Sequence, residues 1–256
     1  MPFPGLSGKL LYHSLFVPYF STFTLGWSLR VKGREHLPKS GPILLLSNHQ
    51  SFLDPPLLGM ATYPRPLTFL ARKELFKNAL FRRMIDYCGA VPIDQSFGRD
   101  GIRAITERLH NGETVAVFPE GERTLDGSMM PLKPGVSLLL RDGDFPIVPV
   151  GIAGAFEAWP RGQKLPHFGL LFLPANNKAL SVVFGEAILP EVYREWERPR
   201  LMAELTLRIR NLQFEAESIR RVPRTSSRDA KRSNETITVI NEPAFQPIHA
   251  SSAQAR

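Results

Sequence analysis

The sequence has very little cysteine and several other absences that narrow its class. Cys88 is the single cysteine among 256 residues, which excludes an intramolecular disulfide and is compatible with a reducing compartment. No small-residue cleavage site follows the apolar run after Lys9, the first basic residue, so the sequence predicts no cleavable signal peptide. The six histidines are scattered, without the spacing of a metal-ligand cluster, and no serine-centred nucleophile elbow is present.

Charged side chains are missing from residues 10–29. An uncharged run of roughly 20 residues is long enough for a bilayer-spanning helix, whereas Pro18, Gly26 and His13 weigh against a full span. Three arrangements stay open: a membrane anchor in the plane of the interface, a core helix, and a span. Aromatic side chains suited to the headgroup boundary favour a helical membrane-anchoring segment over residues 1–30; they are Tyr12, Phe16, Tyr19, Phe20, Phe23 and Trp27.

Basic residues outnumber acidic ones, with a formal net charge of +8. This excess suggests phosphate-bearing partners such as nucleic acid, an anionic membrane face or phosphorylated metabolites. No nucleic-acid-binding signature accompanies the charge, so we expect no nucleic-acid partner. Residues 222–256 are rich in serine and arginine with little apolar periodicity, and we expect a mobile tail there. The tail is either simply solvated or in contact with anionic lipid.

Short apolar runs alternate with amphipathic segments through the middle of the chain. This pattern predicts an α/β domain over residues 31–221, with a mostly parallel or mixed central sheet flanked by helices. Strands are expected at residues 42–47, 67–71, 89–93, 114–119, 146–154 and 180–186, and helices at residues 73–88, 100–110, 135–143 and 200–219.

The segment SNHQSFLD (47–54) follows the first of these strands. If the chain turns into a helix just after His49, then Asp54 can face the imidazole. A carboxylate on one ring nitrogen fixes the tautomer and makes the other nitrogen a better general base. The alternative is a polar turn that caps a helix.

The segment FPEGERTLDGS (118–128) follows the fourth expected strand. Arg123 offers a planar fork suited to a phosphate, and Thr124 and nearby backbone N–H groups are further donors. The alternative is a charged turn in which Glu120 and Arg123 form a surface pair of little energetic value.

Together, NHQSFLD and FPEGERT resemble the first and third sequence blocks of the glycerolipid acyltransferase family, the 1-acyl-glycerol-3-phosphate acyltransferases and their relatives. GAVPIDQS (89–96) looks like the second block, IVPVGIAG (147–154) like the fourth, and ARKELF (71–76) like a basic segment between the first two. The resemblance covers roughly residues 30–190. It implies the glycerol-3-phosphate acyltransferase-like fold.

The resemblance also implies roles for individual residues. His49 is the expected general base and Asp54 its orienting carboxylate, with direct attack of the acceptor hydroxyl on a thioester and no acyl-enzyme. Glu120, Gly121, Arg123 and Thr124 are expected to shape the acceptor site. A second phosphate ligand is expected from Arg72 or Lys73. No metal or cofactor is expected, because the thioester is already activated.

One position departs from the family. Gln95 stands where the second block usually carries arginine, so one charge is lost. Either Arg99 replaces it, or the acceptor's anion is held elsewhere.

The implied partners are a lysophospholipid acceptor, acyl-CoA or acyl carrier protein, and a membrane surface. We expect membrane association at the cytoplasmic face, monotopic rather than spanning. The leading hypothesis is acyl transfer to 1-acyl-sn-glycerol-3-phosphate to give phosphatidic acid. The alternatives are an acyltransferase on glycerol-3-phosphate, another lysophospholipid or a lyso-aminolipid, a non-catalytic lipid- or nucleic-acid-binding protein, and a thioesterase or lipase.

Overall fold

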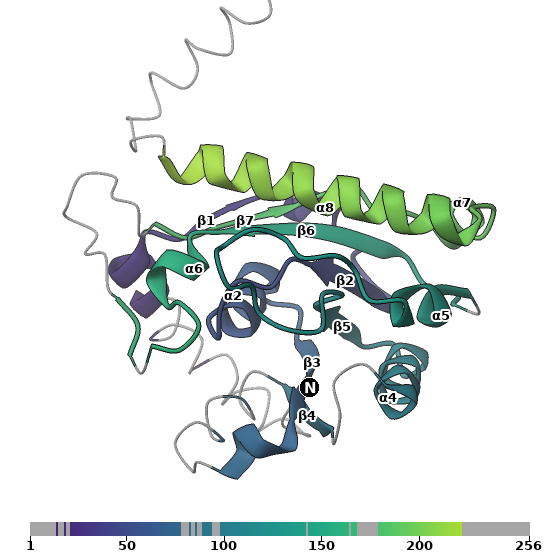
Figure 1. Ribbon diagram of the computed structural model, residues 1–256, viewed down its shortest axis with the longest axis horizontal. Coiled ribbons are helices and arrows are strands. Elements are labelled where there is room, and N and C mark those ends of the chain that lie inside the picture. The colour runs from purple at the N-terminus through teal and green to yellow at the C-terminus, as the bar shows by residue number, and fades with distance from the viewer. Residues whose placement is uncertain are drawn as a thin grey trace, which may run out of the picture. The chain divides into compact units, whose positions relative to one another are not determined.

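A computed structural model describes residues 21–77, 89–93, 98–141, 143–163, 165–167 and 179–221, with Ser14, Pro18, Arg82 and Ile85. Within these residues, seven strands form one sheet in the order β1-β7-β6-β2-β5-β3-β4 (Figure 1). The strands are β1 (Arg30–Lys32), β2 (Ile43–Ser47), β3 (Leu67–Arg72), β4 (Ala90–Ile93), β5 (Thr114–Val117), β6 (Ile147–Ala153) and β7 (Ser181–Phe184).

The sheet is mixed, with a parallel majority. Strands β2 to β6 run parallel to their neighbours among themselves, whereas β7 is antiparallel to β6 and β1 is parallel to β7. All six expected strands are present. The sequence did not predict β1, because its three residues, Arg-Val-Lys, carry too little apolar pattern.

Helices flank the sheet. They are α2 (Asp54–Thr62), α4 (Arg99–His110), α5 (Gly135–Arg141), α6 (Ala155–Ala158), α7 (Pro190–Tyr193) and α8 (Arg198–Arg221), with 3-10 helices η1 (Arg34–His36) and η2 (Lys73–Lys77). The expected helices at 100–110, 135–143 and 200–219 are confirmed as α4, α5 and α8. The helix expected over 73–88 begins as the 3-10 helix η2, and most of its remainder lies outside the described residues.

The core has two layers, one on each face of the sheet. Ile43 and Leu45 of β2 pack with α2, whereas Leu44 and Leu46 pack with α4, α5 and α8. Because side chains alternate along a strand, a central parallel strand covered on both faces is apolar over nearly its whole length, as β2 is from Ile43 to Leu46.

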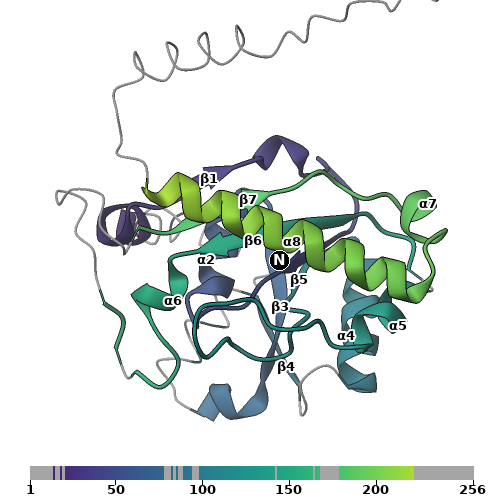
Figure 2. The ribbon, with the colours of Figure 1, turned by 45° about the horizontal axis from the view of Figure 1, so that its top comes forward.

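Helix α8 lies along one face of the sheet, over β6 and β7 (Figures 1 and 2). Its close approach requires Gly151 in β6, since a Cβ there would lie 2.1 Å from the carbonyl carbon of Leu212. The helix therefore fixes β6 from one side, while the carboxyl end of β6 contributes to the site described below.

The end of the N-terminal segment packs into the domain. Residues 21–27 are helical, and Phe23 and Trp27, one turn apart, are buried in the layer that contains α2. This part of the 1–30 segment has the packing of a core helix. No helix among the described residues is both long and apolar enough to cross a bilayer. Most of residues 1–20, and all of the tail at 222–256, lie outside the described residues.

Candidate active site

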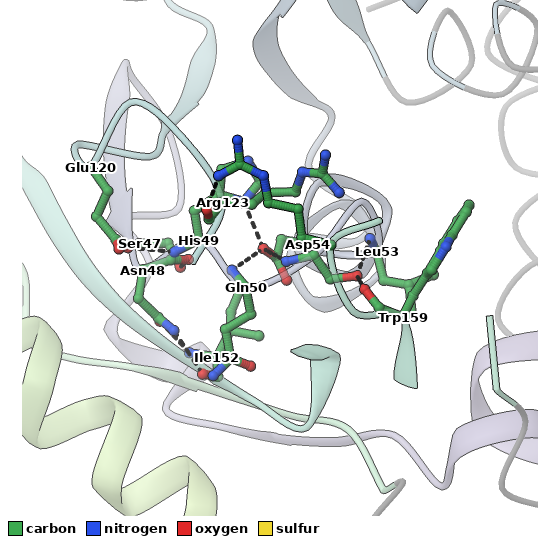
Figure 3. A network of polar contacts seen from close by, with 12 residues as sticks. Ser47, Asn48, His49, Gln50, Leu53, Asp54, Glu120, Arg123, Ile152 and Trp159 are labelled. Atoms are coloured by element: carbon green, nitrogen blue, oxygen red, sulfur yellow. Dashed lines mark hydrogen bonds and ion pairs between the residues drawn. The ribbon is translucent and has the colours of Figure 1, made fainter. Parts of the chain in front are cut away.

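Polar side chains gather where the parallel strands end. Asn48 and His49 follow β2, Glu120 and Arg123 follow β5, and Arg72 ends β3. Parallel neighbours end at the same edge of a sheet, and in open α/β sheets this edge is where ligands bind. The two sequence segments, some seventy residues apart, therefore meet in one place (Figure 3).

The turn from β2 into α2 is held by its own side chains. The hydroxyl of Ser51 accepts the N–H of Leu53 at 3.2 Å and donates to the carbonyl of Trp159 at 2.8 Å. Pro55 and Pro56 occupy the first turn of α2, where missing N–H groups cost nothing. The sequence Asp-Pro-Pro therefore starts the helix at Asp54 and leaves six residues for the turn after β2.

Asp54 is fully buried and binds the imidazole of His49. Its Oδ2 lies 2.7 Å from His49 Nδ1 and also accepts the backbone N–H groups of Gln50 at 2.6 Å and Ser51 at 2.7 Å. The carboxylate therefore performs both tasks that the sequence left open: it stabilises the turn and it orients the ring. With Oδ2 as acceptor, Nδ1 carries the proton and Nε2 is the basic nitrogen.

The other side of the His49 ring is fixed by packing. The ring stacks on Phe118 with centroids 4.0 Å apart and planes inclined by 16°. Within the described residues, Nε2 has no hydrogen-bond partner, and the ring lines a pocket. The imidazole is thus held on one edge and one face, with its basic nitrogen available to a ligand.

Glu120 is also fully buried, and it holds the backbone of His49 rather than its ring. Its two carboxyl oxygens accept the N–H of His49 and the N–H of Met130, each at 2.6 Å. The N–H of Thr124 donates to the carbonyl of His49 at 2.9 Å. Both backbone polar groups of His49 are therefore bound by the FPEGERT segment.

Burial dominates the titration of Glu120. Loss of hydration raises the pKa of its carboxyl from 4.5 to about 7, against the two backbone N–H groups, which lower it. The carboxyl consequently changes protonation near neutral pH, beside the backbone that carries His49.

The FPEGERT turn needs glycine at one position. Gly121 has a φ of +76°, in the left-handed region, and a Cβ there would lie 3.2 Å from the side chain of Lys133. After it, the hydroxyl of Thr124 accepts the N–H of Gly127 at 3.1 Å and donates to Asp126 at 3.1 Å. Thr124 therefore supports the loop and does not line the pocket.

Arg123 lies over the ring of Phe52, with its guanidinium carbon 3.5 Å from the ring centroid. Its Nη1 is buried and has no hydrogen-bond partner among the residues that the structure describes. Burial is the first cause that lowers the pKa of Arg123, followed by the positive charge of Arg161; Asp54 raises it and Arg72 lowers it. A buried guanidinium with an unpaired N–H group is what an anionic ligand would complete.

A cavity of about 410 Å³ opens in front of His49. Of the residues expected at the site, His49, Gly121, Arg123 and Arg72 line it, whereas Asp54, Glu120, Thr124 and Lys73 do not. Arg99, the suggested substitute for the family arginine at position 95, begins α4 and does not line it either, and Gln95 lies outside the described residues. Further lining comes from apolar residues: Phe69, Leu70, Leu75, Ile93, Ile105 and Phe118.

The sequence did not single out Asn48. Its side-chain amide donates to the carbonyl of Ile152 at 2.9 Å and accepts the N–H of Ile152 at 2.8 Å, which ties the end of β2 to β6 (Figure 3). Phe52, Phe118 and Arg161 were also not predicted at the site. The available signal for the first two was the aromatic residue within each of the two segments; no signal pointed to Arg161.

Among the residues that the structure describes, no three His, Cys, Asp or Glu side chains lie close enough to hold a metal ion.

The sequence of this chain is similar to those of known acyltransferases. Residues 28–153 match the family model named Acyltransferase. A probable 1-acyl-sn-glycerol-3-phosphate acyltransferase of Mycoplasma genitalium is 32% identical over 163 residues, 60% of this chain and 59% of that protein. The 1-acyl-sn-glycerol-3-phosphate acyltransferase of Bacillus subtilis is 30% identical over 132 residues, 51% of this chain and 65% of that protein. The alpha enzyme of that name from Homo sapiens is 35% identical over 133 residues, 50% of this chain and 46% of that protein. These matches span less than two thirds of each relative's length.

A solved structure has the same fold. The crystal structure of the 1-acyl-sn-glycerophosphate (LPA) acyltransferase PlsC from Thermotoga maritima aligns with a TM-score of 0.64 and 24% identity. The alignment covers 81% of this chain and 78% of that one.

Proposed function

The chain belongs to the Acyltransferase family over residues 28–153, and from this premise we propose that it transfers a fatty acyl group from a thioester donor to the free hydroxyl of a lysophospholipid. The observation that carries the proposal is the imidazole of His49, oriented by buried Asp54 and presenting Nε2 to a pocket. The named relatives support 1-acyl-sn-glycerol-3-phosphate as the acceptor and phosphatidic acid as the product.

In the proposed reaction, His49 Nε2 removes the proton from the acceptor hydroxyl. The oxygen then attacks the thioester carbonyl carbon, and a C–O bond forms as the carbonyl becomes tetrahedral. Collapse breaks the C–S bond, and the thiolate of coenzyme A or acyl carrier protein leaves with the proton from His49. Asp54 stabilises the imidazolium while it carries that proton. The steps balance without a cofactor, because the thioester is already activated.

The rim of the pocket suits a phosphate-bearing acceptor. Arg123 has a buried N–H group that no described residue accepts, and Arg72 lies on the same pocket, so the two can bind one phosphate. Lys73 follows Arg72 and adds positive charge nearby. Gly121, Glu120 and Thr124 shape this site through the turn and through the backbone of His49.

The apolar lining suits the acyl chain. Leu70, Leu75 and Ile105 form part of it, on the side contributed by β3, η2 and α4. A chain lying there would have its thioester near His49 and its thiol carrier outside. Burial of apolar surface would then contribute roughly 25 cal/mol per Å² to donor binding.

We further propose that the protein works at the cytoplasmic face of a membrane, bound to the surface and not spanning it. Both lipid substrates partition into the bilayer. Phe23 and Trp27 are buried in the core, so the support for attachment to an anionic surface comes from the sequence of the preceding part, with Tyr12, Phe16, Tyr19 and Phe20, and from the net charge of +8. Co-sedimentation with anionic and with zwitterionic vesicles tests this; equal, negligible binding to both would contradict it.

The experiment that tests the function is mass spectrometry of products from mixed acceptors. The acceptors are 1-acyl-sn-glycerol-3-phosphate, other lysophospholipids, a lyso-aminolipid and glycerol-3-phosphate, each with acyl-CoA and with acyl carrier protein. Phosphatidic acid is expected as the main product. Free fatty acid alone would indicate a thioesterase, and no turnover with retained lipid binding would indicate a non-catalytic protein; either result overturns the proposal.

A further inference from the structure

A third arginine lines the rim of the pocket. Arg161 follows α6 and therefore comes from the loop after β6, whereas Arg72 ends β3 and Arg123 follows β5. Three separate segments thus bring guanidinium groups to the cavity that contains His49.

The hydrogen bonds of Arg161 use only one of its nitrogens. Nη1 donates to Glu122 Oε2 at 3.2 Å and to the carbonyl of Arg123 at 3.1 Å. Within the part of the chain that the structure describes, Nε and Nη2 have no hydrogen-bond partner. The side chain is 39% exposed, so these donors remain accessible to a ligand in the pocket.

Positive charge accumulates at this rim. Arg161 and Arg72 both disfavour the charged form of Arg123, which shows that the three cations interact. Two acidic residues, Glu74 and Glu122, lie on the same pocket, and Glu122 pairs with Arg161. A bound dianion would be attracted by three guanidinium groups and could accept from the donors of Arg123 and Arg161 that have no partner within the described residues.

We propose that Arg161 is a specificity-determining residue that binds a phosphate group of a substrate, in exchange for its contact with Glu122. The inference rests on the proposed acyl transfer, whose substrates carry phosphate. A phosphate monoester bears about −1.5 to −2 charge at pH 7 and three acceptor oxygens, which suits more than one guanidinium fork. The phosphate belongs either to the acceptor or to the thiol carrier of the donor.

A purely structural role makes a different prediction. If Arg161 only ties the loop after α6 to the FPEGERT turn through Glu122, removing either partner has the same effect. If Arg161 binds phosphate, loss of Arg161 weakens binding, whereas loss of Glu122 frees the guanidinium and removes a negative charge, so binding is retained or tightened.

The experiment compares Arg161→Gln, Glu122→Gln and Arg108→Gln. Arg108 is a matched control, because it forms an ion pair of the same 3.2 Å length with Glu113 and is 42% exposed, but does not line the pocket. The kinetic arm measures KM and kcat for lysophosphatidic acid and for monoacylglycerol, which lacks phosphate, with acyl-CoA. It is repeated with the acyl thioester of N-acetylcysteamine, a donor without phosphate.

For an acceptor phosphate, Arg161→Gln raises the KM of lysophosphatidic acid about tenfold with either donor and leaves monoacylglycerol unchanged. For a donor phosphate, the KM of acyl-CoA rises about tenfold and that of the N-acetylcysteamine thioester does not. Arg108→Gln changes neither, and Glu122→Gln lowers or preserves the affected KM. Equal losses in Arg161→Gln and Glu122→Gln, or an unchanged KM for every phosphate-bearing substrate, overturn the inference.

A binding arm separates this inference from the proposed function. Calorimetric titration of 1-hexanoyl-sn-glycerol-3-phosphate and of coenzyme A into the wild type and Arg161→Gln requires no turnover. If the wild type transfers no acyl group, the proposed function fails, while a weaker Kd in Arg161→Gln still supports the phosphate site. If neither ligand binds the wild type, or both bind the variant equally, the phosphate site is refuted.

Discussion

The histidine turn, residues 48–54, and the arginine rim, formed by Arg72, Arg123 and Arg161, lie at the same edge of the sheet but satisfy their polar groups differently. In the turn, both backbone groups of His49 and one ring nitrogen are bound by protein. At the rim, and within the described part of the chain, a buried N–H group of Arg123 has no hydrogen-bond partner and Arg161 uses one of its three nitrogens.

This difference follows from what each region would do. A general base must be held in place before the substrate arrives, since a misplaced imidazole loses the aligned proton transfer. Arginine side chains contribute most to phosphate affinity when their N–H groups are not already hydrogen-bonded to protein. Among the described residues, the turn therefore fixes His49 without a ligand, although the buried Asp54 Oδ1 and Gln50 Oε1 in it have no hydrogen-bond partner. At the rim, a ligand would supply partners for Arg123 and Arg161.

Substitution of His49, the proposed general base, should lower the rate of acyl transfer more than any other change in the turn. We expect His49→Ala to lower kcat for acyl transfer about 1,000-fold, or ~4 kcal/mol, because the change removes the nitrogen proposed to accept the proton. His110→Ala, at the exposed end of α4, is the control and should retain activity. Steady-state assays that find more than about a tenth of wild-type kcat in His49→Ala would reject the general-base assignment.

The buried carboxyl of Glu120, which binds the turn, should make the free energy of unfolding depend on pH. In the folded chain burial raises the pKa of Glu120 to about 7, from 4.5, so between these pH values the folded state binds a proton that the unfolded state has released. The free energy of unfolding should therefore fall as pH rises through this window, by on the order of 3 kcal/mol from this group.

We expect Glu120→Gln to remove that part of the pH dependence, measured by urea unfolding at pH 4.5 and pH 7.5. Glu122→Gln, which changes an exposed pocket-side carboxyl two residues away, controls for loss of one acidic side chain. Parallel pH profiles for the wild type and Glu120→Gln would show that this carboxyl does not titrate in the window.

Asp54→Asn should lower kcat about 100-fold, or ~2.7 kcal/mol, with little change in acceptor KM. The neutral amide cannot act as an anionic acceptor for the ring and two backbone N–H groups, and the imidazolium loses its counter-charge. The free energy of unfolding should also fall, by about 1–3 kcal/mol, as measured by thermal unfolding. A variant with normal kcat and raised KM would instead place Asp54 in acceptor binding.

At the rim, Arg123→Lys should have the smallest effect, raising acceptor KM about tenfold, or ~1.4 kcal/mol, with kcat preserved. Lysine keeps the charge but loses the planar fork and the stacking on Phe52. Arg208→Lys is a matched control, since Arg208 also lies over an aromatic ring, Trp196, away from the pocket. A fall in kcat alone would move Arg123 from binding into the chemical step.

Local pattern predicted much of this arrangement. The apolar runs located six strands, because a covered parallel strand is apolar over nearly its whole length, and the five-residue spacing of His49 and Asp54 indicated that they face each other. Pro55 and Pro56 also indicate a helix start, because proline is favoured in the first turn of a helix.

The remaining features depend on chain topology. The contact between Glu120 and the N–H of His49 joins residues 71 apart in sequence, and no local pattern indicates that Glu120 binds the backbone of His49. Arg161 reaches the pocket only because β6 lies next to β2. The position of β7 between β6 and β1, antiparallel to β6, likewise cannot be predicted from the hydropathy pattern.

The amide of Asn48 gives the sheet one more rung than its backbone supplies. The amide bonds both backbone polar groups of Ile152, as a peptide group of a neighbouring strand would, at the point where β2 has ended. Aspartate has no N–H for this exchange, and alanine would leave both groups of Ile152 unpaired in the interior. His49, the next residue, is thus anchored to the central strands β2 and β6, so a side chain that belongs to a loop is held as firmly as one in the sheet.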